Sequence, residues 1–313
     1  MMDNLLEKAE TSFKECLRII IQCSGSDTLE SANTYSKLGS TYVSKGEYQK
    51  AIRCEEECLR IKKINLGDWE SSIVDTYMRL GMIHDSLENY NKALKCYNKA
   101  LSSYKMISGD SSLFFAKVQS RRGGVLVKLR KFHKSLRCYL KAIEFNNKSS
   151  EDEGHVSTDE ELGDIMCSLG QIYGQLGNFD AASSSYENAL SLYEKSVGKN
   201  HPYIAKVLHG LAILHIQKLD LEKAYFVMNE ALDMRQKTLG YDNEFTGDSL
   251  FCIGVIYFLT KRYKESLATL QLAIHIHTNK RGPQHLTVAN EEFYIGCIFG
   301  EFYFSKFIWV IRY

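Results

Sequence analysis

The sequence predicts an all-α fold, a right-handed superhelical solenoid of helix-turn-helix repeats. Three observations support this prediction. Only two of the 313 residues are proline, whereas β-rich or multidomain chains normally place proline in loops, edges and linkers. Small and apolar residues recur every 42 residues along almost the whole chain. Within each interval, large apolar residues are spaced three and four apart, which places them on one face of a helix.

The 42-residue interval appears in three markers that keep a common register. The first marker is, in most copies, an apolar residue followed by a small one, and five extra residues precede its fourth copy. Its copies are Leu38-Gly39, Leu80-Gly81, Arg122-Gly123, Leu169-Gly170, Leu211-Ala212, Ile253-Gly254 and Ile295-Gly296. The second marker is Ala51, Ala93, Ser135, Ala182, Ala224 and Ser266, and the third is Gly67, Gly109, Gly198, Gly240 and Gly282. Such a period indicates a repeat architecture.

Each interval is predicted to contain two helices joined by a tight turn. The first helix carries Tyr35, Leu38 and Tyr42 on one face, and the small Gly39 lets a partner helix approach closely. Turns are expected near Gly46 and Gly177. The second helix has a similar face, made in one copy by Ala93, Tyr97, Ala100 and Leu101.

The glycines of the third marker are predicted to end the second helices, because glycine adopts the left-handed conformation after a last turn without steric cost. Pro202 fits the opening turn of the following first helix, where its missing N–H is not needed. Both prolines fall between helix pairs. We therefore expect one continuous superhelix with a concave inner surface, in which stacked pairs share a core.

The markers divide the chain into six full repeats between two partial ones. We expect a partial repeat with a leader at 1–31, and a partial repeat with an atypical apolar C-terminus at 289–313. The six full repeats are 32–73, 74–115, 116–162 (with an acidic insertion), 163–204, 205–246 and 247–288.

The pattern aromatic-x2-Leu-Gly-x2-Tyr, followed by Ala-x3-aromatic-x2-Ala, resembles the tetratricopeptide repeat over about residues 5–300. The 42-residue length, Leu239-Gly240 and the step from Gly198 to His201-Pro202 resemble the repeats of kinesin light chains. The paired asparagines of those first helices are absent, since Leu208-His209-Gly210-Leu211 stands there, and no heptad pattern precedes the repeats. The resemblance therefore implies this type of repeat rather than a motor subunit.

The resemblance also implies that the first helices line a concave groove. Its predicted residues include the cations Lys37, Arg79 and Arg121, which occupy one repeat position in three successive repeats, and the third repeat adds Lys117 and Lys128. Lys117 and Arg121 lie four apart and share a helix face. Stacked arginine and lysine suit a carboxylate or an acidic peptide. A solvated basic face without ligand preference explains the same cations equally well.

Two further features bear on this groove. In the later repeats its positions are neutral or apolar, which predicts an apolar end suited to a bulky anchor. The acidic stretch from Ser149 to Glu161 is interpreted as a solvated loop, because it has few apolar residues. The alternative is a tethered pseudo-ligand that folds onto the basic residues. The later groove positions are Cys167, Gln171, Ile213, Ile216, Val255 and Phe258.

The sequence contains no Gly-rich phosphate loop, Gly-x-Ser-x-Gly elbow or His-Glu-x-x-His motif. Cys54, Cys96 and Cys138 share a repeat position, but neighbouring repeats lie about a helix diameter apart (~10 Å), too far for joint zinc coordination at about 2.3 Å. We interpret them as small buried core residues. His275 and His277 are two apart and point to nearly opposite helix faces. We therefore expect no enzyme activity, no cofactor and no metal.

The formal net charge of +1 gives no overall signal for nucleic acid or for an anionic membrane. The first residues lack a signal-peptide pattern, and nine cysteines suit a reducing compartment, so we expect a cytoplasmic protein.

From Phe293 to Ile311 the chain is apolar and nearly long enough to span a bilayer, but Glu301 and Lys306 interrupt it. A membrane anchor is therefore disfavoured. A packed last helix, a self-association surface and an altered gene end stay open.

Together these features predict a non-enzymatic scaffold or adaptor that binds a protein or peptide in its concave groove, with a preference for acidic segments. Two alternatives remain. The first is a structural assembly module that uses its convex face or its apolar C-terminal end. The second is an RNA-binding helical repeat, which is disfavoured because the positions that would read bases vary without a code.

Overall fold

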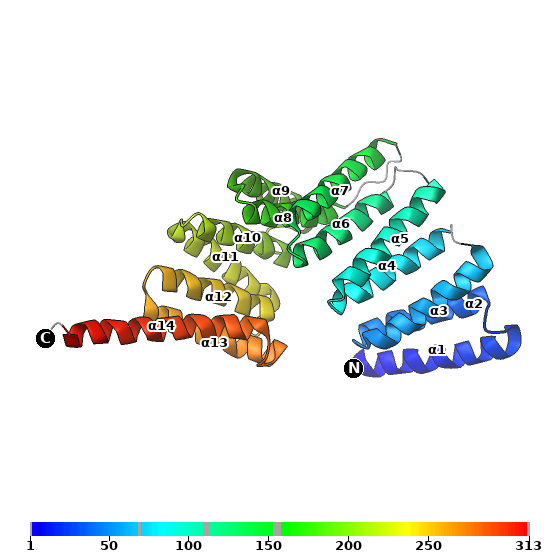
Figure 1. The fold of residues 1–313 in the computed structure, drawn as a ribbon, viewed down its shortest axis with the longest axis horizontal. Helices are drawn as coiled ribbons and strands as arrows, with labels where there is room; N and C mark the ends of the chain where they lie inside the picture. Colours follow the sequence, from blue (N-terminus) through cyan, green and yellow to red (C-terminus); the bar gives the residue numbers. More distant parts are fainter. Residues whose placement is uncertain (1, 68–69, 109–112, 153–157, 312–313) are drawn as a thin grey trace. The chain divides into compact units, whose positions relative to one another are not determined.

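The structure, a computed structural model, describes the backbone of residues 2–67, 70–108, 113–152 and 158–311. Within these ranges the chain forms fourteen α-helices and no β-strand (Figure 1). The all-α prediction is therefore confirmed. Side chains 302–311 lie outside those described.

Contacts divide the chain into two compact units, Met1–Ser157 (unit 1) and Thr158–Tyr313 (unit 2). The array expected to be continuous thus has a boundary within the insertion of the third repeat. Unit 1 contains α1 (Met2–Ser24), α2 (Leu29–Ser44), α3 (Tyr48–Leu66), α4 (Ser71–Ser86), α5 (Tyr90–Ser108), α6 (Leu113–Lys128) and α7 (Phe132–Asp152). Unit 2 contains α8 (Asp159–Gln175), α9 (Phe179–Val197), α10 (Pro202–Gln217), α11 (Leu221–Leu239), α12 (Glu244–Leu259), α13 (Tyr263–Arg281) and α14 (Leu286–Ile311).

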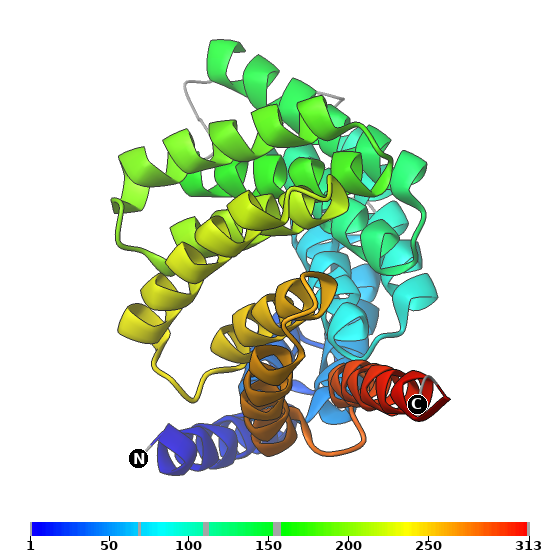
Figure 2. The ribbon, with the colours of Figure 1, turned by 90° about the vertical axis from the view of Figure 1, so that its left-hand side faces the viewer.

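The helices of each unit pack as successive antiparallel pairs (Figures 1 and 2). In every repeat a short first helix is followed by a longer second helix. The pairs are α2/α3, α4/α5 and α6/α7 in unit 1, and α8/α9, α10/α11 and α12/α13 in unit 2.

The turn inside each pair has a left-handed residue, which is glycine at Gly46 and Gly177, as the sequence suggests. The other four repeats place a side-chain-bearing residue there. A left-handed conformation is unfavourable for such residues by roughly 1–2 kcal/mol. A backbone hydrogen bond closes the turn, for example from Asn89 N–H to the His84 carbonyl at 2.8 Å, and satisfies a helix-end carbonyl. The four non-glycine residues are Glu88, Arg130, Leu219 and Lys261.

The third-marker glycines end the second helices, as predicted. Gly67, Gly198, Gly240 and Gly282 are the residues that follow α3, α9, α11 and α13, and their φ angles lie between 77° and 93°. Gly109 lies outside the described residues. Pro202 is the first residue of α10, where its missing N–H leaves no intrahelical bond unmade.

In four of the six repeats the core depends on a close approach between the first-marker glycine and a large side chain of the second helix. Tyr97 lies over Gly81, Tyr139 over Gly123, Tyr186 over Gly170 and Leu270 over Gly254. A Cβ atom added to Gly81 would lie 2.4 Å from the ring of Tyr97. All four large side chains are buried. This contact sets the distance between the two helices of a pair.

Another repeat position, seven residues later on the second helix, carries buried polar groups that reach a neighbouring first helix. Its members include Lys62, Tyr193, Arg235 and His277. Arg235 donates to Ser249 Oγ at 2.7 Å and to the Phe245 carbonyl at 2.6 Å, both on α12. Lys62 donates to the Ser72 carbonyl of α4 at 3.1 Å. These bonds join one repeat to the next.

Among these polar groups, His277 contacts two carboxylates. Its Nδ1 lies 2.6 Å from Glu291 Oε1 on α14, and its Nε2 lies 3.2 Å from Asp248 Oδ1 on α12. His277 and Glu291 are 1% exposed or less. Desolvation lowers the pKa of His277, but hydrogen bonds to Asp248 and Glu291 outweigh it and hold the pKa at about 9. The histidine is therefore protonated at neutral pH.

The glycine–tyrosine contact predicts opposite effects for two adjacent substitutions in α6. Gly123→Ala places its Cβ 2.7 Å from the buried Tyr139 ring, and overpacking of this kind costs about 1–3 kcal/mol. Gly124→Ala meets only the Tyr139 hydroxyl at 3.5 Å, so we expect up to ~1 kcal/mol of stabilisation from higher helix propensity. Urea denaturation followed by circular dichroism measures both. Equal effects of the two variants would contradict this packing.

The His277 contacts predict a loss of stability at alkaline pH. Because the folded pKa of about 9 exceeds the ordinary value of 6.5, the stabilisation is complete below pH 6.5 and disappears as the pH rises towards 9. The urea midpoint of the wild type should fall over this range. His277→Gln lacks the titrating ring, so the difference between the two profiles isolates the histidine from cysteine titration. Parallel profiles would refute the assignment.

Candidate functional site

The cations predicted from the sequence to line a groove lie on the first helices of unit 1. Lys37 is on α2, Arg79 on α4, and Lys117, Arg121 and Lys128 on α6. At 3.6 residues per turn, the three cations of α6 share one face. Four of the five side chains are exposed, and Arg79 is partly covered. We call this surface, with its five cations, the first-helix face.

Arg79 is bound to a carboxylate inside the protein. Its Nε donates to Glu55 Oε1 at 2.9 Å and a terminal nitrogen donates to Thr76 Oγ1 at 3.2 Å. The Glu55 side chain is 1% exposed, whereas that of Arg79 is 33% exposed. Glu55 occupies the repeat position that holds Tyr97 and Tyr139 in the next two repeats, and it packs against Gly39.

The Glu55–Arg79 pair links α3 to α4, which belong to different repeats. Burial raises the pKa of Glu55, and Arg79 and Lys62 oppose that rise. The second oxygen of Glu55, Oε2, has no hydrogen-bond partner among the described residues. Arg79 therefore supplies the counter-charge of a buried carboxylate. Its role as a ligand-binding residue remains a prediction, and the structure gives it another task.

The remaining cations of the first-helix face differ in their surroundings. Lys128 lies 2.8 Å from Asp85 Oδ1 and 5.7 Å from the centre of the Tyr90 ring. Neither Lys37 nor Arg121 forms an ion pair with a described residue. Lys117 is exposed on the same side of α6 as Arg121. Lys37 and Arg121 thus offer their charge to solvent or to a ligand.

The first helices of unit 2 line a cavity of about 270 Å³ between α8 and α10. Three residues predicted for the apolar part of the groove, Cys167, Gln171 and Ile213, contribute to its walls. His209 also lines it, and burial followed by the charge of Arg235 lowers the pKa of His209 to about 4. The ring is therefore neutral at physiological pH. Lys206, which lies 2.6 Å from Asp164, is the charged residue of the lining.

The acidic stretch after the third repeat is more ordered than the sequence suggests. Helix α7 continues to Asp152, and α8 begins at Asp159 behind Thr158, whose side chain accepts a hydrogen bond from the Glu161 N–H. The carboxylates of residues 159–161 occupy the first turn, where they interact favourably with the helix dipole. The loop interpretation is wrong for these residues. Residues 153–157 lie outside the described part of the chain, as do the side chains beyond Glu301.

The cysteine row predicted as core filler is mostly buried. Cys54 and Cys138 are buried and Cys96 is half-buried, and burial raises the pKa of the Cys54 thiol to about 11. Among the described residues, no cluster of three metal-ligating side chains occurs. No helix in the described ranges is long and apolar enough to cross a membrane.

Unit 1 contains a second group of cations that was not predicted from the sequence. They line a cavity between α5, α6 and α7, on the other side of α6 from the first-helix face. One signal was available, because Arg122 interrupts a marker position that is otherwise leucine or isoleucine. The five cations are Arg122, Lys131, Lys134, Arg137 and Lys141.

Comparison with known families identifies the repeat. Two family models, both described as tetratricopeptide repeat, match residues 2–64 with 161–237 and residues 74–103, which together make up more than half of the chain. The chain belongs to the tetratricopeptide repeat family. The fold of this family is a scaffold for protein–protein interactions in general. No curated protein matches the sequence.

Solved structures show the same fold at low identity. A tetratricopeptide repeat protein from Parabacteroides merdae aligns with 82% of this chain and 89% of its own, at 16% identity and a TM-score of 0.54. Nearly identical repeats of a putative kinesin light chain from Podospora anserina align with 67% of this chain and 97% of theirs (14%, 0.53). The APC/C hetero-tetramer Cut9–Hcn1 gives 0.60 at 11% identity, over 92% of this chain and 46% of the matched one. The predicted resemblance to kinesin-light-chain-type repeats is confirmed at the level of the fold.

The Glu55–Arg79 pair predicts a large stability effect for one cation of the first-helix face. Arg79→Ala leaves a buried carboxylate without a counter-charge, and such a change typically lowers the free energy of unfolding by about 3–5 kcal/mol. Because Arg79 is one-third exposed, we expect a smaller loss of about 2–3 kcal/mol here. Adding Glu55→Gln should recover most of that loss. Arg121→Ala, at an exposed position, should change the free energy of unfolding by about 0.5 kcal/mol or less. Similar losses for Arg79→Ala and Arg121→Ala would contradict the structural role.

Proposed function

We propose that this protein is a non-enzymatic scaffold or adaptor that binds an acidic segment of a partner protein on the first-helix face of unit 1. The observation that carries the proposal is the exposure of Lys37 and Arg121 without ion pairs to described residues. Lys117 adds a third exposed cation one turn from Arg121. Carboxylates of an acidic segment would bind these side chains through charge-assisted hydrogen bonds.

The cavity between α8 and α10 supports a second, less polar contact on the first helices of unit 2. Its walls combine Ile213 and Leu214 with the amides of Gln171 and Gln217. Such a lining suits an uncharged side chain or an extended backbone. We include in the proposal that this cavity receives a ligand.

One observation favours the alternative of a structural assembly module. On α14, the last described helix, Phe293 is 67% exposed and Phe299 is 56% exposed. Exposed aromatic side chains of this size at the end of a repeat array promote association. Cytoplasmic location is also part of the proposal. It rests on the nine cysteines, all of which are free thiols.

The proposed site predicts that charge reversal on the first-helix face weakens acidic-peptide binding. The variant Lys37→Glu/Arg121→Glu should bind a fluorescein-labelled oligoglutamate peptide at least ~10-fold more weakly, a change of about 1.4 kcal/mol. Fluorescence anisotropy at several salt concentrations should also show a smaller salt dependence for the variant, since fewer charges interact.

The matched control is Lys92→Glu/Lys95→Glu, which reverses two exposed lysines of the second helix α5. It makes the same change in net charge away from the first-helix face. If the control weakens binding as much as Lys37→Glu/Arg121→Glu does, the peptide responds to overall charge alone and the proposed site is wrong.

A further inference from the structure

A groove runs between the second helices α5 and α7 of unit 1, with the first helix α6 as its floor. We call it the α5–α7 groove. Each helix contributes residues spaced three and four apart, so one face of each helix lines it. The lining residues are Leu94, Asn98, Leu101 and Lys105 on α5; Phe115, Gln119, Arg122 and Leu126 on α6; and Lys134, Arg137, Lys141 and Phe145 on α7.

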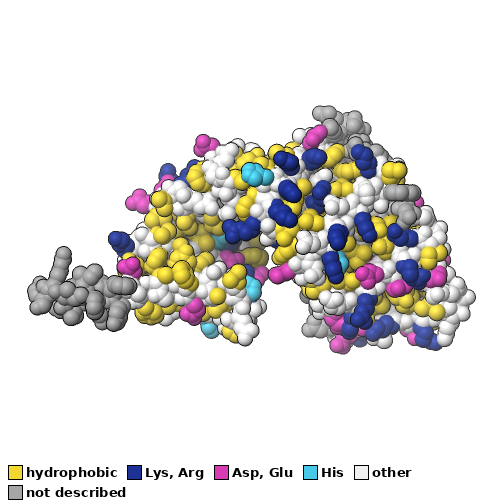
Figure 3. Space-filling model, viewed as in Figure 1, with side chains coloured by type: hydrophobic (Ala, Val, Ile, Leu, Met, Phe, Trp, Pro, Cys, Tyr) yellow, Lys and Arg dark blue, Asp and Glu magenta, His cyan; other side chains and the backbone are white. Residues whose placement is uncertain are grey.

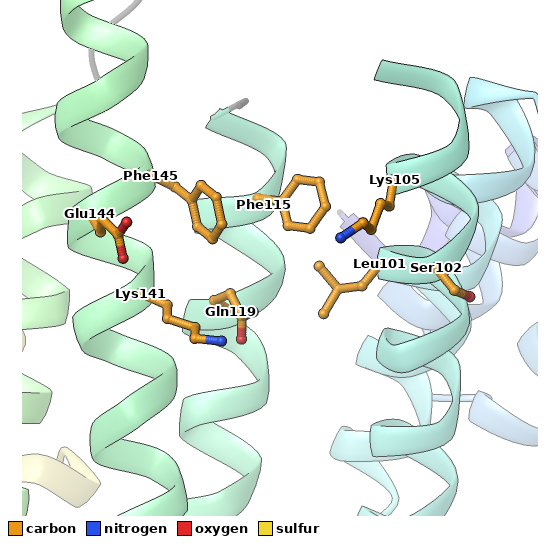
Figure 4. Close-up of a pocket in the computed structure, with 8 residues that line it drawn as sticks. All are labelled: Leu101, Ser102, Lys105, Phe115, Gln119, Lys141, Glu144 and Phe145. Carbon is orange, nitrogen blue, oxygen red and sulfur yellow. The ribbon is translucent and has the colours of Figure 1, made fainter. Parts of the chain in front are cut away.

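The groove consists of two adjoining cavities of about 470 and 410 Å³. Gln119 and Lys141 line both, so the two cavities adjoin at these residues. Figure 4 shows the first cavity, in which Phe115 and Phe145 face the gap from α6 and α7, opposite Leu101 and Lys105 of α5.

The first cavity is the apolar half. The rings of Phe115 and Phe145 pack 5.1 Å apart between centres, and Leu101 forms the opposite wall. Glu144 also lines this half. The rings lie against each other rather than exposing open faces. The space suits one bulky apolar side chain.

The second cavity is the basic half. Its described lining contains five cations and no acidic residue. Lys134, Arg137 and Lys141 follow one another on successive turns of α7 and are exposed. Figure 3 shows Lys and Arg side chains gathered over the part of unit 1 that contains α5, α6 and α7. No described residue forms an ion pair with Lys131, Lys134, Arg137 or Lys141.

Only the third repeat has a cation at all five of these positions. The first repeat has Lys50 and Arg53 at the positions of Lys134 and Arg137, and the second has lysine at the positions of Lys134, Arg137 and Lys141. The fourth repeat has the same fold with none of these charges. Packing of the repeat therefore does not require them. Its equivalent residues are Leu169, Asn178, Ala181, Ser184 and Asn188.

Two of the cations stand where the fold favours other residues. Arg122 replaces the leucine or isoleucine of the first marker, which is buried at Leu38, Leu80 and Leu169. Lys131 directly precedes α7, where the helix dipole disfavours a cation and the fourth repeat has the capping residue Asn178. Local departures of this kind occur at functional sites, where they are offset by another gain.

Arg122 is also incompletely bonded. One of its terminal nitrogens donates to Gln119 Oε1 at 3.0 Å, but its buried Nε has no hydrogen-bond partner among the described residues. A half-buried guanidinium without a counter-charge is unfavourable. A carboxylate in the basic half would supply both the missing acceptor and the missing charge.

The α5–α7 groove is separate from the first-helix face. On α6, Phe115, Gln119, Arg122 and Leu126 point about 150° away from Lys117, Arg121 and Lys128, at 100° per residue. Binding at one surface therefore leaves the other accessible, and either assignment can fail without the other.

We propose that the α5–α7 groove is a second binding site, which takes a short acidic segment of a partner protein carrying one bulky apolar side chain. The carboxylates lie against Arg122, Lys134, Arg137 and Lys141, and the apolar side chain enters the space beside Phe115 and Phe145. Lys134 and Phe145 are eleven residues apart on α7, or about 16 Å. That length matches about five extended residues. Glu144 and the mutually packed rings disfavour a nucleic acid strand.

The test is Arg122→Leu, which restores the repeat's usual residue. We expect it to weaken binding of a labelled glutamate-rich peptide with one central phenylalanine at least ~10-fold when it is added to Lys37→Glu/Arg121→Glu, in which the first-helix face no longer contributes. It should also raise the midpoint of thermal unfolding, because a half-buried charge is removed. A merely structural arginine would lower that midpoint. Lys134→Glu/Arg137→Glu should show the same loss of binding. The matched control Lys92→Glu/Lys95→Glu, at the equivalent positions of the second repeat, should bind this peptide within twofold of the wild type.

Two other probes complete the experiment with the full chain. A peptide with alanine in place of phenylalanine should bind about 5-fold or more weakly than the parent, because the apolar half stays empty. A single-stranded RNA oligonucleotide should bind no better than Arg122→Leu binds the peptide. The proposal is overturned if adding Arg122→Leu to Lys37→Glu/Arg121→Glu leaves peptide binding unchanged, if Arg122→Leu unfolds at lower temperature than the wild type, or if the RNA binds the wild type more tightly than the peptide does.

Discussion

The structure depends on one contact, the packing of a large second-helix side chain over the first-helix glycine of the same repeat. At Gly81, Gly123 and Gly170 the aromatic ring lies so close that any Cβ atom would overlap it. The contact draws the two helices together and fixes how they face each other. Because it recurs with the repeat, consecutive pairs present equivalent surfaces for stacking. The side chains that take no part in this contact form the remaining surfaces of the repeat.

Buried polar groups add a second level of order, because they differ from repeat to repeat while the glycine contact recurs in four of the six repeats. Glu55 is bonded to Arg79, Arg235 to Ser249, and His277 to Glu291, each across a boundary between helix pairs. A buried charge is tolerated only where its partner is present. A pair stacked in the wrong order would separate such partners. The polar positions therefore specify which repeat follows which.

The sequence was sufficient for the fold and insufficient for the surfaces. The period, the helix faces and the glycine ends are local properties, so they could be predicted residue by residue. The left-handed turns at Glu88 and Leu219 could not, because there the closure of the helix pair overrides the preference of the residue. The repeat position of Arg79 predicts a residue of the groove. In the structure Arg79 forms an ion pair with Glu55, which lies 24 residues earlier in the chain. Arg122 was visible as a departure from the marker, yet its meaning required the neighbouring faces of α5 and α7.

These observations indicate that the residues which depart from the repeat pattern are the ones that carry information about function. Residues that keep the period are held there by the glycine contact and say little about partners. Where a residue departs from the period without disrupting the fold, its unfavourable local effect is offset by another interaction. Glu55 is offset inside the protein by Arg79. Arg122 has no comparable acidic partner among the described residues, and its neighbours on α7 add charge of the same sign. The same physical rule, that a covered charge needs its counter-charge, therefore explains one departure as structural and directs the other outward to a ligand.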